Sequence, residues 1–213
     1  MKNQKDVRTI AFIAMLGALS AVLMAIRVPL PFAPAFLEFD IAELPALFAG
    51  FFLGPVSGCG VIVVKNLLKL LTQGTQTAFV GDFMNIISSI CFMLPAALIY
   101  RFHHTKKGAV IGLTAATLFV SVVCVFLNAW ISFPMYSRIY GMSMESIVAM
   151  GSAVNPLVTD TVTLMLFSIF PFNLVKHGVT ALVTYLVYKR CGNALRRVLS
   201  PGKQETDRKK SGN

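Results

Sequence analysis

Amine and amide side chains interrupt two stretches of this chain that are otherwise apolar. The segment from Lys65 to Lys69 (KNLLK) lies inside an early apolar run, and the segment from Pro171 to Lys176 (PFNLVK) opens the last one. Ionisable groups at membrane depth are costly, and they are usually retained for a task. We therefore expect these side chains to help build a small-molecule pocket inside a bundle of membrane helices.

The composition places the chain among polytopic membrane proteins. Of its 213 residues, 56% are hydrophobic and 13% are charged, whereas soluble domains carry about 25% charged residues. Mean hydropathy is +0.72, and one soluble core could not bury the 17 Phe and 10 Met. The first apolar run is too long for a cleaved signal peptide and leads into more membrane-length sequence.

Apolar runs and the residues that break them predict an all-α fold with six transmembrane helices. The expected spans cover residues 9–28, 41–54, 56–72, 79–100, 108–133 and 171–189. The first matches the 20 or so residues that a bilayer requires, and the second is shorter. Pro134 is expected to end the fifth span. Pro171 is expected to begin the sixth, because a proline has no N–H to leave unpaired in the first turn of a helix.

Two connections are less regular. Pro29, Pro31 and Pro34 predict an extended loop that reaches Phe39. Within residues 135–170, an apolar piece at 157–170 is either a short interfacial helix or the top of the sixth span. We expect one membrane domain over residues 9–190, with basic cytoplasmic tails at 1–8 and 191–213.

The basic residues indicate a multi-pass protein of the plasma membrane with both termini in the cytoplasm. The net charge is +10, and 14 of the 19 Lys and Arg residues fall in three segments outside the apolar runs. This clustering is the positive-inside signal, with some attraction to anionic lipid headgroups. The basic segments lack the interleaved aromatics of single-strand binders, so nucleic acid is not expected as a partner. The 14 residues are Lys2, Lys5, Arg8, Arg101, Lys106, Lys107, Lys189, Arg190, Arg196, Arg197, Lys203, Arg208, Lys209 and Lys210.

With this orientation, polar side chains from five segments lie in the outer half of the bundle. The third span runs outward from Pro55, so Lys65 lies about 15 Å and Lys69 about 21 Å along it. The inner half has almost no polar residues, which predicts a cavity that is open to the outside and closed below. An ion conduit would need polar groups through the whole thickness. The other polar residues of the outer half are Asp40, Glu43, Asp82, Asn85, Asn128, Asn173 and Lys176.

Structural interpretations of the charged residues stay open. Lys65 and Lys69 could form ion pairs with Glu43 or Asp82 that serve the fold alone. Asp40 and Glu43 could simply favour the N-terminus of a helix through its dipole.

The same holds for the amide and aromatic residues. Asn128 could form a hydrogen bond near the end of its helix. Trp130, Tyr136 and Tyr140 could belong to an interfacial aromatic belt. His177 is more often a packed histidine than a ligand contact.

The first span carries a stripe of small residues at spacings of four, three and four. Ala14, Ala18, Ala21 and Ala25 lie on one face, with Gly17 beside them. Small residues let helices approach closely in lipid. The stripe serves either packing within the bundle or docking of another membrane protein.

The sequence contains no motif for catalysis, nucleotide hydrolysis or metal binding. GxxxxGK[ST], HExxH and GxSxG are all absent, which speaks against a motor or an enzyme. Cys59, Cys91, Cys124 and Cys191 are isolated, so we expect neither disulfides nor a metal site. No cofactor is expected.

Several short motifs stand in order along the chain. They are FDIAELP at 39–45, Gly54-Pro55, KNLL at 65–68, GDFMN at 81–85, Asn128 with Pro134 and Tyr136, and PFNLVK at 171–176. This ordered set resembles the riboflavin-specific (RibU-type) S components of energy-coupling factor (ECF) transporters, over nearly all of residues 9–190. In that family, a six-helix S component captures a vitamin from outside and works with a transmembrane T component and a pair of cytosolic ABC ATPases.

The resemblance implies that riboflavin is the transported ligand, with Asn128, Asn173 and Lys176 as polar contacts. A carboxamide both donates and accepts hydrogen bonds, which suits the pyrimidine edge of the isoalloxazine ring, and an ammonium favours its carbonyl and ring nitrogen. The Pro-rich loop can cover the apolar end of the ring as a lid. Further candidate ligand-binding residues, the middle four for the ribityl hydroxyls, are Phe39, Asp40, Glu43, Lys65, Asn85 and Tyr136.

The resemblance also implies that the small-residue stripe docks the T component, through Ala14 and Ala18.

Three other functions are alternatives to a riboflavin-specific S component. One is an S component for another vitamin, such as thiamine or pantothenate. The others are a membrane enzyme acting on lipid or peptide, and an autonomous channel or carrier.

Overall fold

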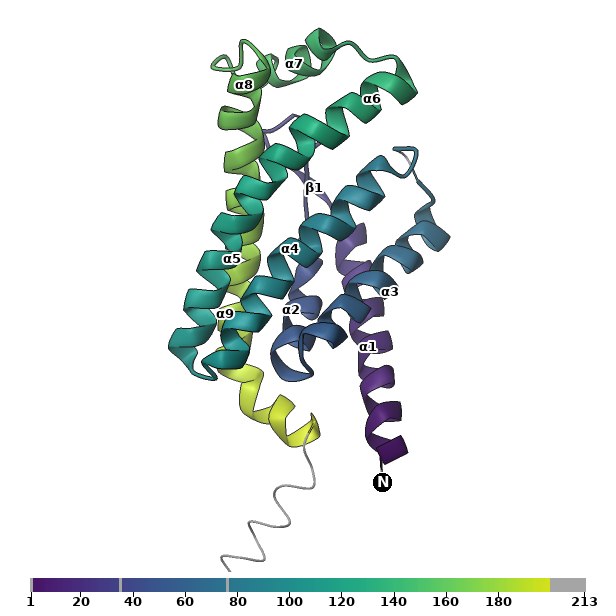
Figure 1. Cartoon of the computed structure of the whole chain (residues 1–213), viewed down its shortest axis with the longest axis vertical. Helices are drawn as coiled ribbons and strands as arrows, with labels where there is room; N and C mark the ends of the chain where they lie inside the picture. Colours follow the sequence, from purple (N-terminus) through teal and green to yellow (C-terminus); the bar gives the residue numbers. More distant parts are fainter. Residues whose placement is uncertain (1, 35, 76, 200–213) are drawn as a thin grey trace, which may run out of the picture.

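The structure, a computed structural model, describes residues 2–34, 36–75 and 77–199, with side chains described between residues 6 and 190. It is built almost entirely of helices, as the sequence predicts (Figure 1). α1 and α9 extend into the expected tails at 1–8 and 191–213, and residues 200–213 lie outside the described residues. The helices are α1 (Lys2–Ala25), α2 (Glu43–Phe52), α3 (Pro55–Gln73), α4 (Val80–Phe102), α5 (Lys106–Leu127), the π-helical turn η1 (Asn128–Ser132), α6 (Phe133–Tyr140), α7 (Met144–Ser152), α8 (Thr161–Leu164), the π-helical turn η2 (Met165–Ile169) and α9 (Phe170–Leu199).

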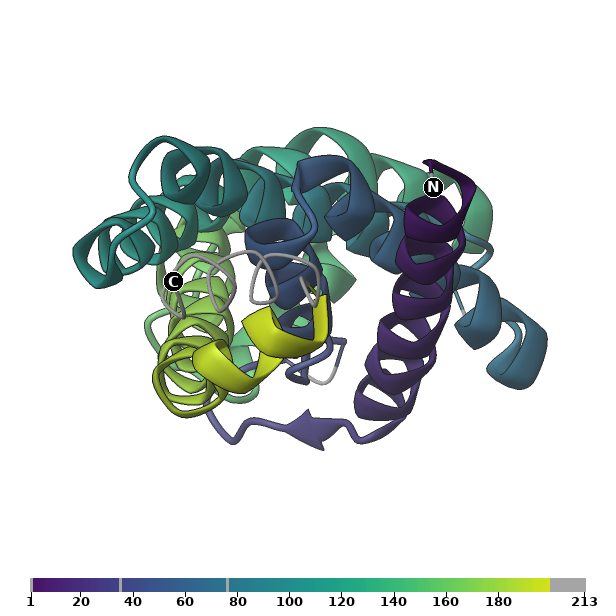
Figure 2. The same cartoon turned by 90° about the horizontal axis from the view of Figure 1, so that it is seen from below.

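Five helical segments of the described chain are long and apolar enough to cross a membrane. The second expected span is instead the ten-residue α2, which is about 15 Å long and cannot cross an apolar layer of about 30 Å by itself. Eight of its ten residues are buried, and it lies in the interior of the bundle, with α1 on one side and α5 and α9 on the other (Figure 2). The five segments are Asp6–Ala25, Pro55–Gln73, Val80–Phe102, Lys106–Tyr140 and Thr161–Arg190.

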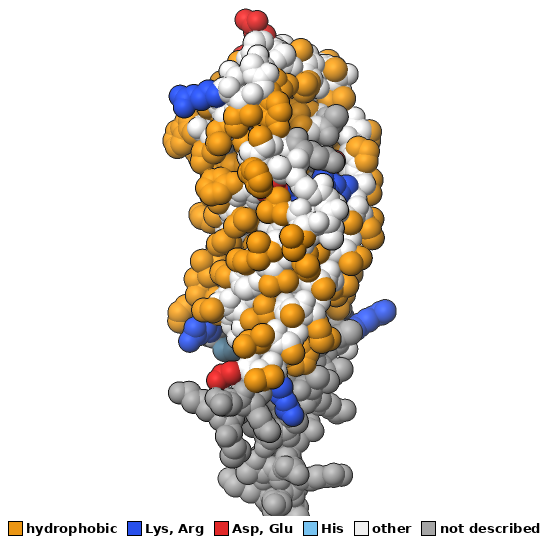
Figure 3. All heavy atoms as spheres, turned by 90° about the vertical axis from the view of Figure 1, so that its right-hand side faces the viewer, with side chains coloured by type: hydrophobic (Ala, Val, Ile, Leu, Met, Phe, Trp, Pro, Cys, Tyr) orange, Lys and Arg blue, Asp and Glu red, His pale blue; other side chains and the backbone are white. Residues whose placement is uncertain are grey.

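Many large apolar side chains are exposed on the outside of the bundle, and Figure 3 shows one face where they are abundant. Val56, Leu71 and Trp130 are 86%, 83% and 74% exposed. Exposing such an apolar surface to water would be unfavourable, whereas the apolar tails of lipids can cover it. The chain is therefore a multi-pass membrane protein.

The fifth span does not end at Pro134, so that prediction was wrong. α5 continues through η1 and α6 as one segment from Lys106 to Tyr140. A proline lacks the N–H of the helical ladder, and its ring collides with the carbonyl four residues earlier. The preceding turn is widened into the π-helical η1, and such bulges let a helix bend around a proline without ending.

The prediction that the sixth span begins at Pro171 was also wrong. The helix begins at Thr161 and passes Pro171 by way of η2. The carbonyl of Phe167, four residues before this proline, accepts a hydrogen bond from Asn155 Nδ2 at 3.0 Å. The carbonyl that faces the proline is thus satisfied from a neighbouring loop.

A capping box fixes the true start of this helix. Asp160 Oδ1 accepts the N–H of Thr163 at 2.7 Å, and Thr163 Oγ1 accepts the N–H of Asp160 at 2.8 Å. The bond from the Thr163 N–H, together with its hydroxyl, lowers the pKa of Asp160 below its usual value. Of the two interpretations of residues 157–170, the one that makes them the top of the sixth span holds from Thr161 onward.

A short β-hairpin connects α1 to α2, and α7 and α8 lie above it in Figure 1. β1 (Val28–Pro29) pairs antiparallel with β2 (Glu38–Phe39). Arg27 fastens this hairpin to two helices, because its guanidinium contacts Glu38 Oε2 at 2.6 Å, Gln73 Oε1 at 3.1 Å and the Met24 carbonyl at 3.1 Å. The Pro-rich segment is thus anchored at its base.

An apolar core closes the bundle below the hairpin. Its centre includes Ala46, Ile62 and Phe92, all fully buried. At its lower end, the hydroxyls of Tyr100 and Tyr188 lie 3.0 Å apart. The expectation of a bundle that is apolar in its lower half agrees with this core.

Close approach of α1 to α3 depends on a glycine. A Cβ atom on Gly17 would lie 2.4 Å from Val64 Cγ1, so only glycine fits at this contact. On the next turns, Ser20 and Met24 are buried on the same side of α1, and the Ser20 hydroxyl donates to the Ala42 carbonyl. α1 therefore faces the bundle with Gly17, Ser20 and Met24.

Candidate ligand-binding site

A polar cavity lies between the hairpin and the upper parts of the helices. Its volume is about 350 Å³, and α1, the hairpin, α3, α4, α6 and α9 all contribute to its wall. The expected convergence of separate segments beneath one end of the bundle is therefore present. The described residues that line the cavity are Met24, Arg27, Phe36, Glu38, Asp40, Lys69, Thr77, Gly81, Asp82, Asn85, Tyr136 and Lys176.

Two buried ion pairs form part of the wall. Lys176 Nζ donates to Asp40 Oδ2 at 2.8 Å, joining α9 to the segment that leads into α2. Lys69 Nζ donates to Asp82 Oδ1 at 2.5 Å and to the Gly74 carbonyl at 2.9 Å, joining α3 to α4. Because each charge has a partner of opposite sign, the free-energy cost of burying these four groups is reduced.

The wall is balanced in charge but retains unused acceptors. With the rim pair of Arg27 and Glu38, the three cations that line the cavity face three carboxylates. Asp82 Oδ2 and Asn85 Oδ1 are buried and have no hydrogen-bond partner among the described residues. Such an oxygen costs about 1–3 kcal/mol when it stays unpaired, so a ligand that donates hydrogen bonds would be stabilised here.

A second, apolar compartment adjoins the polar cavity. Its volume is about 240 Å³, and it shares Phe36, Thr77 and Tyr136 with the polar cavity. The ring of Phe36 meets that of Phe133 edge to face, with centroids 6.3 Å apart. The other described residues of this compartment are Tyr140, Met142, Ile147 and Met150, so α6 and α7 supply most of an aromatic and aliphatic wall.

A third buried ion pair lies deeper and is sealed from the cavity. Lys65 and Glu43 are 0% and 1% exposed. Lys65 Nζ lies 3.4 Å from Glu43 Oε1, and the Ser89 hydroxyl bridges the two at 2.9 and 3.0 Å. Neither residue lines the described cavity walls. For this pair the geometry agrees with the structural interpretation.

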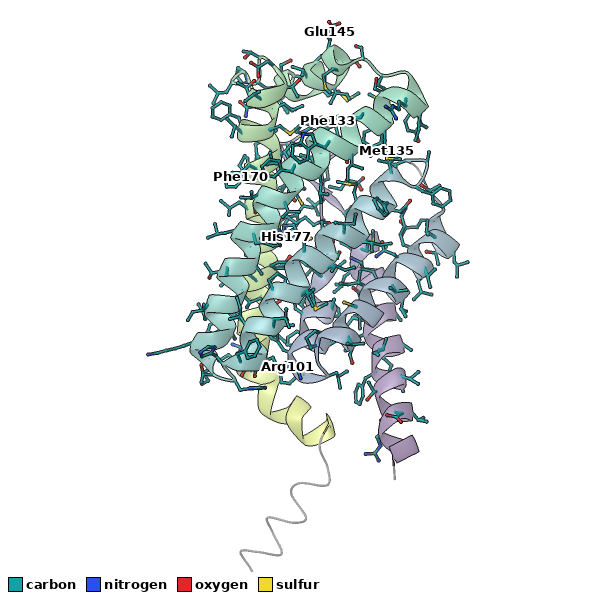
Figure 4. All side chains as sticks on the ribbon, viewed as in Figure 1. Arg101, Phe133, Met135, Glu145, Phe170 and His177 are labelled. Carbon is teal, nitrogen blue, oxygen red and sulfur yellow. The ribbon has the colours of Figure 1, made fainter. Side chains whose placement is uncertain are left out.

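His177 is a packed residue. Its ring lies 4.7 Å from that of Phe92 in a T-shaped contact, and it is 2% exposed. It sits at mid-height of the bundle, well below Phe133 (Figure 4). The structure therefore agrees with the interpretation of His177 as a packed histidine, and this residue does not line either compartment.

Three other candidates stand apart from the described cavity walls. Asn173 is buried and Asn128 half-buried, and each amide donates to the carbonyl four residues earlier, of Ile169 and Cys124, at 2.8 Å. Phe39 is half-buried in β2. Of the nine ligand-binding candidates, the structure brings Asp40, Asn85, Tyr136 and Lys176 to the cavity, and it places Glu43 and Lys65 beneath it.

Sequence reasoning did not single out several lining residues. Arg27 was not among the candidates, yet it forms the rim with Glu38. Lys69 and Asp82 were noted as polar residues at the right depth but not as ligand-binding candidates. Their signal was present, since Asp82 precedes the candidate Asn85 by three residues and shares its helix face. The residues of α7, by contrast, lie in a segment for which no helix was predicted.

The small-residue stripe of α1 lies on the outside. Ala14, Ala18 and Ala25 are exposed and Ala21 is half-buried, whereas Gly17 faces the bundle. Packing within the bundle therefore falls to Gly17 and its neighbours. The alanine face is left free for contacts outside this chain.

A small amphiphilic cavity under one end of a membrane-embedded helical bundle is typical of membrane proteins that bind small molecules. Comparison with known proteins places this chain more narrowly. The family described as "ECF transporter, substrate-specific component" matches residues 8–188. This chain belongs to that family, and the resemblance seen in the sequence is confirmed.

Two individual relatives align with this chain over most of their length. The chain is 32% identical to "Riboflavin transporter RibU" of Staphylococcus aureus (strain TCH60), over 92% of this chain and 96% of the relative. It is 28% identical to "Riboflavin transporter FmnP" of Bacillus subtilis (strain 168), over 85% and 90%. These relatives are transporters, which confirms the expectation that the chain is not an enzyme.

A solved structure shares the fold. It is described as "Structure and mechanism of the S component of a bacterial ECF transporter", and it superposes with a TM-score of 0.70 at 31% sequence identity. The match covers 92% of this chain and all of the other.

Proposed function

We propose that this chain is the riboflavin-binding S component of an ECF transporter and that riboflavin occupies the two joined compartments. The observation that carries the proposal is the division of one site into a polar part and an apolar part, which meet at Phe36, Thr77 and Tyr136. Riboflavin is divided in the same way, into a dimethylbenzene end and a polar end formed by the pyrimidine edge and the ribityl hydroxyls. The names of the relatives support the same ligand.

The ring system lies across the junction, with its apolar end between Phe36 and the wall of α6 and α7. The ribityl chain then faces Asp82 and Asn85, whose free oxygens accept hydrogen bonds from its hydroxyls. The balanced charge of the wall favours a neutral ligand such as riboflavin. A net charge would have to be desolvated without a free partner.

The two remaining amides act once the ligand is present. Asn173 lies three residues before Lys176, on the same face of α9. Rotating its amide away from the Ile169 carbonyl turns it to the pyrimidine edge, and Asn128 acts likewise from η1. In the free protein these amides are kept satisfied by their own helices.

Uptake requires partners that this chain lacks. The family context supports a transmembrane T component and two cytosolic ABC ATPases, which would supply the energy. The exposed alanine face of α1, with Ala14 and Ala18 at its centre, offers the close helix approach that such docking needs. The basic ends of α1, α4 and α9 then face the cytoplasm, and the cavity opens to the outside.

Spectroscopy of the purified chain tests the proposal. We expect the protein, purified after growth with riboflavin, to show the absorption bands of bound flavin near one molecule per chain. Excess thiamine or pantothenate should not displace it. A colourless protein that binds one of these other vitamins would overturn the choice of riboflavin.

A further inference from the structure

A separate groove runs along the outer surface between α5 and α9. Its volume is about 420 Å³, and Leu118 and Leu182 on its walls are 52% and 58% exposed. The hydroxyl of Thr117, one of its few polar groups, donates to the Leu113 carbonyl of its own helix at 2.8 Å. The described residues of the groove are Val110, Leu113, Thr114, Thr117, Leu118, Leu174, Gly178, Ala181, Leu182 and Tyr185.

This groove is remote from the proposed docking face. α5 and α9 lie on one side of the bundle and α1 on the other, both from the side and from below (Figures 1 and 2). The groove shares no lining residue with the ligand cavity. Whatever occupies it is therefore neither the vitamin nor a partner seated on α1.

Three lysines stand below one end of the groove. On α5, Lys107 precedes the groove residue Thr114 by seven positions, so both lie on one face, and Lys106 stands beside it. On α9, Lys189 follows Tyr185 by four positions and shares its face. All three are exposed, and none forms a salt bridge with a described carboxylate.

These lysines lie at the boundary between membrane and water. Lys106 is the first residue of the span Lys106–Tyr140, and Lys189 is next to last in the span Thr161–Arg190. The N-terminus of α5, capped by Thr105, adds a partial positive charge at this level. α9 continues to Leu199, so the negative end of its dipole lies about 15 Å further on.

In the part of the chain that the structure describes, no carboxylate neutralises this end of the groove. Among the described residues, the acidic residue near this end of the bundle is Asp6, which belongs to α1 on the opposite side. A long apolar channel thus ends at a group of cations at headgroup depth.

We propose that the α5–α9 groove and Lys106, Lys107 and Lys189 together form a site for an anionic phospholipid. An acyl chain lies along the groove, and the phosphate group sits among the three ammonium groups. The order of chemistry along the site, apolar and then cationic, matches the order of groups in such a lipid. A helix of another protein would fill the groove but would leave the cations without a counter-charge.

Native mass spectrometry of the full-length chain in detergent tests the proposal, with phosphatidylglycerol and phosphatidylcholine of identical acyl chains offered in equal amounts. We expect phosphatidylglycerol adducts to exceed phosphatidylcholine adducts about 150-fold, since each of the three basic residues contributes about 1 kcal/mol. The double variant K107Q/K189Q should reduce this preference to about fivefold, the contribution of the remaining Lys106. The matched control R190Q removes one charge one residue away, on a different face of α9, and should leave the preference unchanged.

The groove itself is tested by filling it. A Cβ atom on Gly178 meets no other atom within 4 Å, so Gly178→Leu should fold, keep the thermal midpoint of the wild type and lose adducts of both lipids. Leu182→Trp replaces it should Gly178→Leu prove unstable. Equal binding of the two lipids by the wild type, an undiminished preference in K107Q/K189Q, or adducts that survive a folded groove-filling variant would each overturn the site.

Discussion

The buried pair of Lys65 and Glu43 gives the sharpest separation of a structural role from ligand binding. Lys65→Met leaves the Glu43 carboxylate with the Ser89 hydroxyl but without its cation. Removing one partner of a buried pair costs about 3–5 kcal/mol. In a chain of this size, 1 kcal/mol shifts the thermal midpoint by about 2–4 °C, so we expect it to fall by about 6–20 °C.

Thermal unfolding in detergent measures this, with variants that separate charge from packing. The double variant Glu43→Gln/Lys65→Met removes both charges and keeps a hydrogen-bonding partner for Ser89, so most of the lost midpoint should return. Arg138→Met, at an exposed position, should change it by less than about 2 °C. A Lys65→Met protein as stable as the wild type would mean that the buried pair does not stabilise the fold.

Riboflavin binding by the same double variant completes the test. Because neither side chain lines the cavity, the affinity of the stable double variant should stay within about threefold of the wild type. A larger loss of affinity would mean that Lys65 and Glu43 contribute to riboflavin binding.

Three further predictions concern the cavity, α1 and the sixth span. Asn85→Ala removes a free acceptor from the polar compartment, so riboflavin affinity measured by titration should fall by about 5–150-fold, the equivalent of about 1–3 kcal/mol. An unchanged affinity would mean that the ribityl chain does not contact Asn85. Ala14→Trp should retain riboflavin binding but stop uptake in cells that hold the T component and ATPases, and uptake at the wild-type rate would contradict docking through the alanine face. Asn155→Ala leaves the Phe167 carbonyl without its side-chain donor, which should lower the thermal midpoint by about 2–4 °C, whereas an unchanged midpoint would mean that η2 satisfies that carbonyl alone.

The class of the protein and the place of its site followed from the sequence because both depend on composition and depth. The cost of burying a charge in lipid makes Lys69, Asp82 and Lys176 conspicuous in an apolar chain. A constant rise per residue then places them near one end of the bundle. The ion-pair partners of these side chains could not be predicted from the sequence, because they depend on which helices pack against each other.

The two proline errors share one physical cause. A proline inside an apolar run can end a helix, begin one, or be passed by a π-bulge. At Pro171, the choice depends on a side chain sixteen positions earlier, Asn155, that reaches the Phe167 carbonyl. A pattern of neighbouring residues around Pro171 cannot predict a contact made by a residue so far away in the sequence. The capping box at Asp160, however, was a local signal for the true start.

The stripe on α1 shows a different limit. Its spacing established that Ala14 and Ala18 share a face but not which way that face points. The orientation is set by Gly17, which alone can approach Val64. One tight contact thus turns the alanine face outward.

Riboflavin binding can be measured by a fluorescence titration with the purified chain. We expect quenching of the flavin emission that ends at one riboflavin per chain, as the ring enters the compartment walled by Phe36 and Tyr136. Lys176→Met, which unpairs Asp40 in the wall, should weaken this binding, whereas Arg138→Met should not. An absence of quenching by the folded wild-type protein, or equal binding by Lys176→Met, would contradict the proposed riboflavin site.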